Sequence, residues 1–387
     1  MDRVKLAVIG IGNMGSFHLG IIAKQPKVQL AAVCDIVPEL ALEAAEQYKC
    51  QAYFDSQALL ADHLCDAVLI ATPHYAHTTI GIAALQAGYH VLVEKPISVH
   101  KADCERLIAA HQDKRLVFAA MFNQRTDPHF RKIRQLVQDG ELGQLERLSW
   151  IITDWFRSQF YYDSGGWRAT WKGEGGGVLL NQCPHNLDLL QWICGMPRRV
   201  HGFCGLGAWH NIEVEDQVTA YLEYPNRCTG IFIASTGEAP GSNRLEIAGD
   251  RGKIVFENGV LTFTRNEVSS RRFCQESTQM FARPEVWDIS LPLHGSGGQH
   301  ADILENFADA ILEGARLIAP AEQGIHSVEL ANAMLYSSWM HQPVDLPMDG
   351  ADYEQKLHEL IRNSRFEKTS SETLAGDVDK SFNISPS

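Results

Sequence analysis

A glycine-rich turn near the N-terminus constrains the fold of this chain more than any other feature. The segment Gly10-Ile11-Gly12-Asn13-Met14-Gly15 follows the apolar, β-branched run 4–9 and precedes apolar residues at helical spacing. Asp35 lies 20 residues after Gly15, at the end of the next expected strand. A Gly-x-Gly-x-x-Gly turn between a strand and a helix, followed at this distance by a carboxylate, is typical of dinucleotide-binding βαβ units. The sequence therefore predicts an N-terminal dinucleotide-binding Rossmann domain.

The same turn predicts how the dinucleotide is held. The first glycine permits the tight turn, the second lets backbone approach the pyrophosphate, and the third lets helix and strand pack closely. Asp35 accepts hydrogen bonds from the adenosine ribose and repels a 2′-phosphate, and apolar Ile36 and Val37 stand where an arginine would favour NADP. NAD is therefore expected over NADP, with a nucleotide-free doubly wound fold as the alternative. The expected cofactor contacts here are Gly10, Ile11, Gly12, Asn13, Met14, Gly15 and Asp35.

Strand and helix signals alternate over residues 4–123, which predicts a parallel sheet with helical crossovers. The expected strands are 4–9, 29–34, 66–71, 90–94 and 116–122, and the expected helices are the segment from Gly15 to Pro26, 38–48, 76–87 and 101–112. We expect residues 1–124 to form this α/β Rossmann domain.

Strands dominate after about residue 125. They are expected at 145–153, 198–206, 216–224, 228–235, 243–248, 253–256 and 260–264, with helices near 127–138, 181–193, 300–313 and 322–340. We expect residues 125–365 to form an α+β domain with a large, mostly antiparallel open sheet that binds substrate and mediates oligomerisation. The last segment, 366–387, rich in Ser, Thr, Asp and Gly, is expected to be a flexible tail.

Composition excludes several classes of partner. The 387 residues include 34 Lys and Arg against 47 Asp and Glu, a net charge of −13, which argues against nucleic-acid binding and against an anionic membrane surface. The nine cysteines form no Cys-x-x-Cys and no zinc spacing. Neither a basic leader nor an apolar run of about 18 residues is present. A cytoplasmic protein with reduced thiols, no metal and a small-molecule substrate is expected.

A lysine follows the expected strand 90–94, the fourth in the sheet. The segment is Val91-Leu92-Val93-Glu94-Lys95-Pro96. Lys95 is therefore expected at the carboxyl end of the strand, in the crevice where parallel sheets bind ligands. Desolvation in the crevice would lower its pKa. On these residues alone, a lysine in a surface salt bridge is the alternative.

Taken together, several motifs resemble the glucose–fructose oxidoreductase/inositol dehydrogenase (Gfo/Idh/MocA) family over about residues 4–345. Besides the glycine turn and Glu94-Lys95-Pro96, they are Ala71-Thr72-Pro73…His77, Phe122-Asn123-Gln124-Arg125 and Glu174-Gly-Gly-Gly-Val-Leu-Leu-Asn181-Gln-Cys-Pro-His185-Asn-Leu-Asp188. The resemblance implies that Lys95 and His185 flank the reacting carbon. It also implies cofactor contacts from Ala71, Thr72, Pro73, His77, Glu94, Lys95, Asn123 and a loop over the nicotinamide that carries Trp167 and Arg168.

The chain departs from the family pattern at two positions. Asn181 replaces the usual Asp, and His74 stands where Asn often follows Thr-Pro. An amide can position a hydroxyl but cannot lend negative charge to an imidazole. Lys95, His185 and Asn181 are the expected catalytic residues, but Asn181 lacks the negative charge of the family's Asp, and His74 replaces one of the family's cofactor contacts.

His185 lies on a stripe formed by Asn181, His185, Asp188 and Trp192. Pro184 prefers a first helical turn, so the helix is expected to begin near residue 183 with Asn181 just outside it. His185 then lies at the positive helix end, which disfavours the imidazolium and keeps a neutral base near pH 7. A structural, hydrogen-bonded histidine is the alternative.

An aromatic stretch follows the first strand of the second domain. Residues 155–171 contain seven aromatic residues and two arginines, which suit stacking on sugar rings and binding of hydroxyls. A subunit interface or core edge is an equal alternative. The expected substrate contacts are Lys95, Arg157, Tyr161, Trp171, Asn181 and His185.

Within the family, the segment 161–185 is most similar to glycoside 3-dehydrogenases. This resemblance implies an NAD-dependent oxidoreductase that transfers a hydride between C3 of a pyranoside and nicotinamide, giving a 3-keto sugar. A homodimer or homotetramer is expected, because an open antiparallel sheet offers an association surface. The alternatives are a redox-neutral NAD-dependent glycosidase or lyase, a cyclitol dehydrogenase and, against the presence of both Lys95 and His185, a non-catalytic NAD-sensing regulator.

Overall fold

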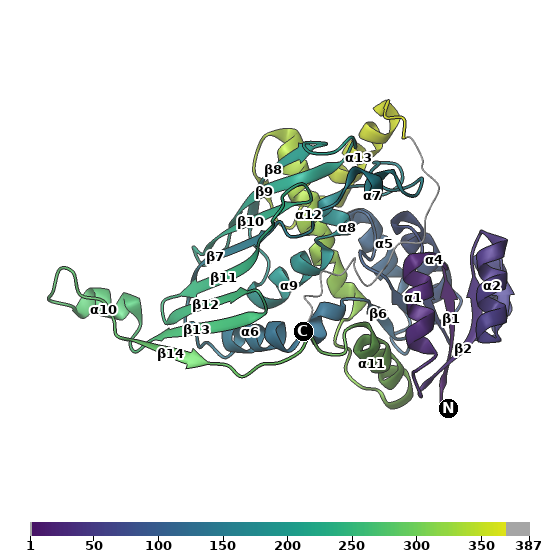
Figure 1. Cartoon of the computed structure of the whole chain (residues 1–387), viewed down its shortest axis with the longest axis horizontal. Coiled ribbons are helices and arrows are strands. Elements are labelled where there is room, and N and C mark those ends of the chain that lie inside the picture. Colours follow the sequence, from purple (N-terminus) through teal and green to yellow (C-terminus); the bar gives the residue numbers. More distant parts are fainter. Residues whose placement is uncertain (1, 369–387) are drawn as a thin grey trace.

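The computed structural model describes residues 2–368, which build two sheets (Figure 1). The first sheet has six parallel strands in the order β3-β2-β1-β4-β5-β6. They are β1 (Val4–Ile9), β2 (Val28–Cys34), β3 (Gln51–Tyr53), β4 (Ala67–Ile70), β5 (His90–Val93) and β6 (Phe118–Ala120). This order is that of a dinucleotide-binding Rossmann sheet, with its topological switch point between β1 and β4. The predicted α/β fold is confirmed.

Five helices connect these strands: α1 (Asn13–Ile22), α2 (Pro38–Tyr48), α3 (Ser56–Ala61), α4 (His74–Gln86) and α5 (Lys101–Ala110). The prediction omitted β3 and α3, which are only three and six residues long and carry too little pattern to identify. Lys95 consequently follows the fifth strand along the chain, not the fourth.

The second sheet has nine strands in the order β14-β13-β12-β11-β7-β10-β9-β8-β15. They are β7 (Leu145–Ile152), β8 (Arg199–Leu206), β9 (Glu215–Glu223), β10 (Thr229–Ser235), β11 (Asn243–Gly249), β12 (Gly252–Glu257), β13 (Val260–Asn266), β14 (Val286–Ser290) and β15 (Val344–Asp345). Neighbouring strands are antiparallel except β7 and β10, which confirms the mostly antiparallel sheet. The strands β14 and β15 were not predicted.

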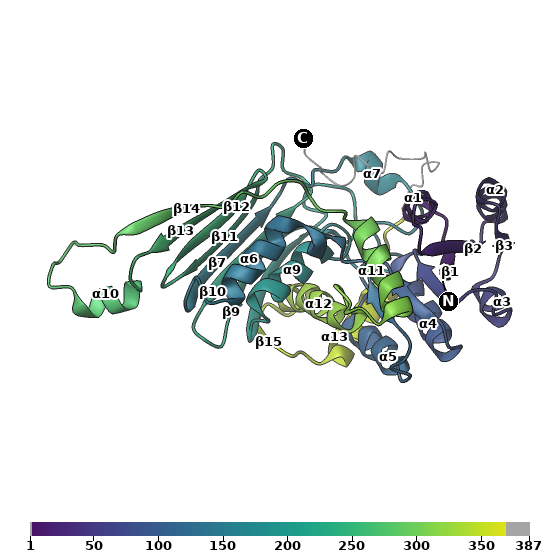
Figure 2. The same ribbon diagram turned by 90° about the horizontal axis from the view of Figure 1, so that it is seen from below.

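Helices cover one face of the second sheet (Figure 2). The helical elements of the second half are η1 (Asn123–Thr126), α6 (Pro128–Gln138), α7 (Gln159–Asp163), α8 (Val178–Asn181), α9 (Pro184–Cys194), α10 (Ser270–Glu276), α11 (His300–Glu313), η2 (Ala321–Gln323), α12 (Gly324–Met340) and α13 (Gly350–Asn363). The helix α12 packs against β8 and α9, and α6 packs against α9. The opposite face exposes side chains of β8, β9 and β10, among them Phe203, Tyr221 and Ile231.

The chain returns to the first domain late in its course. Side chains of α11, including Leu304 and Phe307, are buried in the core of the parallel sheet. The boundaries 1–124 and 125–365 therefore stay predictions. Residues 369–387 of the expected tail, 366–387, lie outside the described residues. No helix within residues 2–368 is long and apolar enough to cross a membrane, and all nine cysteines have free thiols.

Candidate active site

The glycine turn after β1 is closed on its protein side and open on the other. Gly10 has a φ of +93°, and a Cβ there would lie 2.7 Å from the Ala71 carbonyl oxygen. A Cβ on Gly15 would lie 1.8 Å from the Gly10 carbonyl oxygen, so α1 could not pack this closely. A Cβ on Gly12 would meet no heavy atom of the described residues within 4 Å. The turn thus leaves room for a ligand at Gly12.

The start of α1 is electrostatically suited to an anion. No side chain caps the first turn of α1, so its amides remain available. Asp35 accepts hydrogen bonds from the Ile11 amide at 2.6 Å and the Val37 amide at 2.9 Å, which fixes the carboxylate beside the turn. Ile36, next to it, is 87% exposed. Free amides, an open glycine and a neighbouring carboxylate fit the pyrophosphate and ribose of a dinucleotide.

Residues after β4 and β6 line the same crevice. The two ring nitrogens of His77 lie within hydrogen-bond distance of backbone carbonyl oxygens, Nδ1 at 2.8 Å from that of Pro96 and Nε2 at 2.7 Å from that of Thr72. His77 therefore joins the two loops that follow β4 and β5. The Thr72 hydroxyl and the Asn123 amide oxygen are buried without a hydrogen-bond partner among the described residues. The expected contacts Ala71 and Pro73 flank Thr72 at the end of β4.

A buried ion pair supports the backbone of Lys95. Glu94 accepts hydrogen bonds from His18 at 2.6 Å and from the Lys95 amide at 3.0 Å. Although burial acts to raise it, the hydrogen bond and charge of His18 bring the pKa of Glu94 down to about 2. Burial lowers the pKa of nearby His300 to about 4. His18 was not predicted as a site residue; its only signal in the sequence is its place three residues after Gly15.

Lys95 and His185 share one site. The Lys95 ammonium donates a hydrogen bond to the Asn181 carbonyl at 3.1 Å, in the segment that leads into the helix of His185. His185 is the second residue of α9 and is 6% exposed. Its Nδ1 atom is buried without a hydrogen-bond partner among the described residues. The structure thus brings together the two predicted catalytic groups, and their roles stay a prediction.

The pKa values of these two groups are shifted in the direction that chemistry at neutral pH requires. Burial, reinforced by the charges of Lys95 and His300, holds the pKa of His185 well below its usual range. Burial also lowers the pKa of Lys95. His185 is therefore a neutral imidazole at pH 7, able to accept a proton.

Asn181 is the last residue of α8 and Pro184 the first residue of α9, which confirms that the helix of His185 begins near residue 183 with Asn181 outside it; the coarser range 181–193 is broken between the two helices. The break follows from proline, which lacks an amide and clashes with a preceding turn. The Asn181 amide donates to Glu174, and its oxygen accepts from the Tyr161 hydroxyl at 3.2 Å and from Gln182 at 3.1 Å. Asn181 therefore holds its neighbours in place and presents no unused polar atom.

The aromatic loop supplies guanidinium groups stacked on rings. Arg168 donates to the Tyr161 hydroxyl at 2.7 Å, with its guanidinium carbon 4.4 Å from the Tyr161 ring centre and 4.8 Å from that of Trp167. Trp167 in turn meets His74 edge to face. The Arg157 guanidinium lies 5.1 Å from the Tyr161 ring centre. The Nε atom of Arg168 is buried without a partner among the described residues, which leaves it for a ligand.

Trp171 lies elsewhere than expected. Its side chain is 3% exposed and packs edge to face against Trp339 of α12, in the core of the second domain. Its amide donates to Glu213 at 2.8 Å. Trp171 thus has the core position that was the alternative for this stretch, and we do not carry it into the substrate site.

Two buried glutamates to which no role was assigned from the sequence hold the glycine run 175–177. Glu215 of β9 accepts hydrogen bonds from the amides of Gly177 at 2.8 Å and Leu179 at 3.0 Å. Glu174, 1% exposed, accepts from the Ala169 amide at 2.7 Å and from Asn181. A charged residue before three glycines was the only sequence signal for Glu174, and Glu215 had none because its contact depends on the sheet.

Glu215 should make stability depend on pH. Burial raises the pKa of Glu215 to about 7, above the value of 4.5 expected in the unfolded chain. The folded state then binds the extra proton, so this contribution is present at low pH and is lost as the pH rises from about 4.5 through about 7. We expect the unfolding free energy of the native protein, relative to Glu215→Gln, to fall by about 3 kcal/mol over this range. Urea unfolding at a series of pH values measures it, and parallel pH profiles would contradict it.

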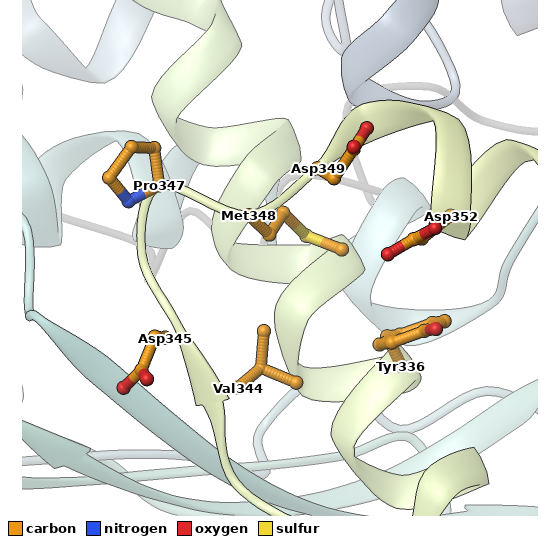
Figure 3. A pocket seen from close by; sticks show the side chains of 7 residues that line it. All are labelled: Tyr336, Val344, Asp345, Pro347, Met348, Asp349 and Asp352. Carbon is orange, nitrogen blue, oxygen red and sulfur yellow. The ribbon is translucent and has the colours of Figure 1, made fainter.

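A separate cavity of about 200 Å³ lies beside β15 and α13 (Figure 3). Two of its three acidic side chains have structural partners: Asp345 pairs with Arg199 at 2.6 Å, and Asp349 caps α13 through the Ala351 amide at 2.8 Å. The lining residues are Tyr336, Val344, Asp345, Pro347, Met348, Asp349 and Asp352. None of the predicted site residues is among them, so the Lys95 crevice remains the candidate active site.

Comparison with known proteins agrees with this geometry. Residues 4–122 match the family model described as an oxidoreductase family with an NAD-binding Rossmann fold, and residues 130–255 match the GFO/IDH/MocA C-terminal domain. Levoglucosan dehydrogenase from Pseudarthrobacter phenanthrenivorans is 26% identical over 91% of this chain and 100% of its own length. Inositol 2-dehydrogenase from Rhizobium meliloti is 24% identical over 86% of this chain and 96% of its own.

A solved structure shows the same fold. The crystal structure of the WlbA dehydrogenase from Bordetella pertussis, in complex with NADH and UDP-GlcNAcA, superposes with a TM-score of 0.76 at 23% identity. The match covers 90% of this chain and 100% of the other.

Proposed function

Because this chain belongs to the GFO/IDH/MocA family of oxidoreductases, with an NAD-binding Rossmann domain, we propose that it oxidises the C3 hydroxyl of a pyranoside to a 3-keto sugar with NAD as the cofactor. The observation that carries this proposal is the joining of Lys95 and His185 at the carboxyl ends of the parallel strands. The glycine turn lies at the same edge of the sheet, which is where such folds bind dinucleotides.

The two groups divide the chemistry between them. Bound NAD supplies the hydride acceptor, C4 of its nicotinamide. His185, neutral because it is buried, accepts the proton of the substrate hydroxyl. The Lys95 ammonium stabilises the negative charge that develops on the oxygen and, in the reverse direction, polarises the ketone. The amides at the start of α1 and the Asp35 carboxylate hold the pyrophosphate and ribose.

The aromatic loop supports a sugar as the substrate. Tyr161 and Trp167 offer ring faces, and the unpartnered Nε of Arg168 offers a donor for a hydroxyl. The levoglucosan dehydrogenase among the relatives is named for an anhydrosugar. Position C3 follows from the similarity of segment 161–185 to glycoside 3-dehydrogenases.

A panel of sugars tests the proposal. The protein is incubated with NAD and with pyranosides, their 3-O-methyl and 3-deoxy analogues, and cyclitols, and NADH absorbance is followed. We expect NADH from pyranosides with a free C3 hydroxyl and none from the C3-blocked analogues. Equal rates with the blocked analogues would contradict C3 oxidation, and no NADH from any compound would contradict the dehydrogenase.

Cyclitol oxidation is the second candidate, supported by the inositol 2-dehydrogenase relative. A cyclitol ring presents the same secondary hydroxyls to Lys95 and His185 but has no ring oxygen or anomeric substituent. The same panel decides between them. A kcat/KM for myo-inositol above that of every pyranoside would favour the cyclitol.

Asp35 should set the choice between NAD and NADP. Its carboxylate faces the position of the adenosine ribose, so Asp35→Ala loses two hydrogen bonds to NAD and also a charge that repels the 2′-phosphate. We expect KM for NAD to rise by about 10–100-fold while KM for NADP falls or stays unchanged. Ile36→Ala is the matched control, because Ile36 is exposed beside it. An equal rise in both KM values would instead indicate damage to the turn through the lost Ile11 contact.

The open face of the second sheet supports a homodimer or homotetramer. Phe203, Tyr221 and Ile231 project from that face and are exposed in the single chain, whereas alternate residues such as Leu222 and Phe232 are buried under the helices. Exposed apolar side chains of this size on a sheet are typical of an interface. Light scattering of the purified protein measures the oligomer, and a monomer would contradict it.

A further inference from the structure

The carboxylate of Glu174 sits at the centre of a closed hydrogen-bond network. One oxygen accepts from the Ala169 amide and the other from the Asn181 side-chain amide. Asn181 then accepts from the Tyr161 hydroxyl, which itself accepts from Arg168 at 2.7 Å. The network therefore runs from Glu174 through Asn181 to the loop that faces the site.

Only a group with two acceptor atoms satisfies the position of Glu174. Both of its neighbours, the Ala169 amide and the Asn181 amide, are donors. A glutamine of the same shape would turn its NH₂ towards one of them, leaving two donors in contact. The carboxylate also fixes the direction of the whole network, since it decides which end of the Asn181 amide faces Tyr161.

Glu174 also carries charge into the site. The carboxylate acts electrostatically on Lys95, opposing the lowering of the Lys95 pKa by burial and by Arg168 and Arg157. Arg168, Lys368 and Lys95 are the cations that surround it, and Glu215 is the neighbouring carboxylate. Asn181, whose backbone carbonyl accepts the hydrogen bond from the Lys95 ammonium, carries no charge of its own.

We propose that Glu174 is a positioning residue of the dehydrogenase site, whose carboxylate holds Lys95 as a cation by its charge and, through the Asn181 side chain, orients Tyr161 and Arg168. This role rests on the proposed function. Because the carboxylate and the amide are joined by one hydrogen bond, exchanging the two groups keeps one charge and one amide in the pair. The exchange distinguishes a shared function from two separate structural contributions.

The experiment compares four proteins: the native chain, Glu174→Gln, Asn181→Asp and the double variant Glu174→Gln/Asn181→Asp. We expect each single change to lower kcat by about 10²-fold, because one leaves no carboxylate and the other sets two carboxylates against each other. The double variant should regain most of that loss. NADH affinity, measured by fluorescence, should change far less than kcat in all four, because the network does not touch the glycine turn that holds the pyrophosphate.

Glu215→Gln, alone and with Asn181→Asp, is the matched control. Glu215 is an equally buried carboxylate that accepts two amides, but it does not contact Asn181. Its loss should not be recovered by Asn181→Asp. An unchanged kcat in Glu174→Gln, or a double variant no better than the product of the single losses, would overturn the proposal.

The proposed function can fail separately. If the native protein produces no NADH from any sugar or cyclitol, the proposed dehydrogenase activity is contradicted. Thermal unfolding of the same four proteins then tests whether Glu174 and Asn181 act as a pair. Midpoints that fall in both single variants and recover in the double support the exchange between Glu174 and Asn181. Additive midpoints contradict it.

Discussion

Replacing Lys95 by methionine is expected to lower kcat by about 10³-fold while changing NADH affinity far less. Methionine keeps the length of the side chain but cannot donate a hydrogen bond or stabilise negative charge on the substrate oxygen. The glycine turn and Asp35, which hold the dinucleotide, do not contact the ammonium group. The measurement combines steady-state kinetics on the accepted sugar with NADH titration by fluorescence.

Lys101→Met controls for the loss of a buried lysine. Lys101 is also buried, and its ammonium donates a hydrogen bond to Glu329 at 2.8 Å. This contact has no part in the proposed chemistry. Its removal should lower stability but not the kcat of the folded protein. A Lys95→Met variant that retains native kcat would contradict the role of Lys95, and one that loses NADH binding would indicate a collapsed site.

Breaking the Arg125–Asp188 pair is expected to cost about 3–5 kcal/mol of stability. Arg125 follows β6 in η1 and donates two hydrogen bonds to Asp188 of α9, at 2.7 and 2.6 Å, with both side chains 1% exposed. A third bond, at 2.6 Å, reaches Gln323. Asp188→Leu leaves the guanidinium charge buried and unpaired, at the junction that carries His185.

Urea unfolding of the single and double variants measures this cost. Arg125→Met/Asp188→Leu removes both charges, so it should lose less stability than Asp188→Leu alone. The exposed pair Arg272–Glu276, on α10, is the control, and Arg272→Met should cost less than about 1 kcal/mol. A loss in Asp188→Leu as small as in this control would contradict a structural clamp between the sheet and α9.

The sequence was most informative where local pattern and tertiary structure agree. The strands β1, β2, β4 and β5 are apolar runs buried in a parallel sheet, and their order follows from alternation with helices. The short strands β3 and β15 have three and two residues, too few for any period. The strand β14 is largely exposed, so its apolar residues follow no burial pattern.

The site was predictable in its motifs but not in its hydrogen bonds. Lys95 is placed by the end of a strand, and His185 by a proline that starts a helix, and both signals are local. Contacts across the chain carry the rest. Glu174 meets Asn181 only because Glu215, from a strand of the second sheet, fixes the glycine run between them. The core position of Trp171 also depends on a contact across the chain, because its neighbour Trp339 lies far from it in the sequence.

A crystal structure of the protein with NADH and a pyranoside that the panel identifies as a substrate tests the central claim most directly. We expect one sugar hydroxyl, on C3, to lie within about 2.6–3.2 Å of both Lys95 Nζ and a His185 ring nitrogen, with its carbon facing C4 of the nicotinamide. A sugar whose C3 hydroxyl is bound by other side chains, or a nicotinamide placed away from Lys95 and His185, would contradict it.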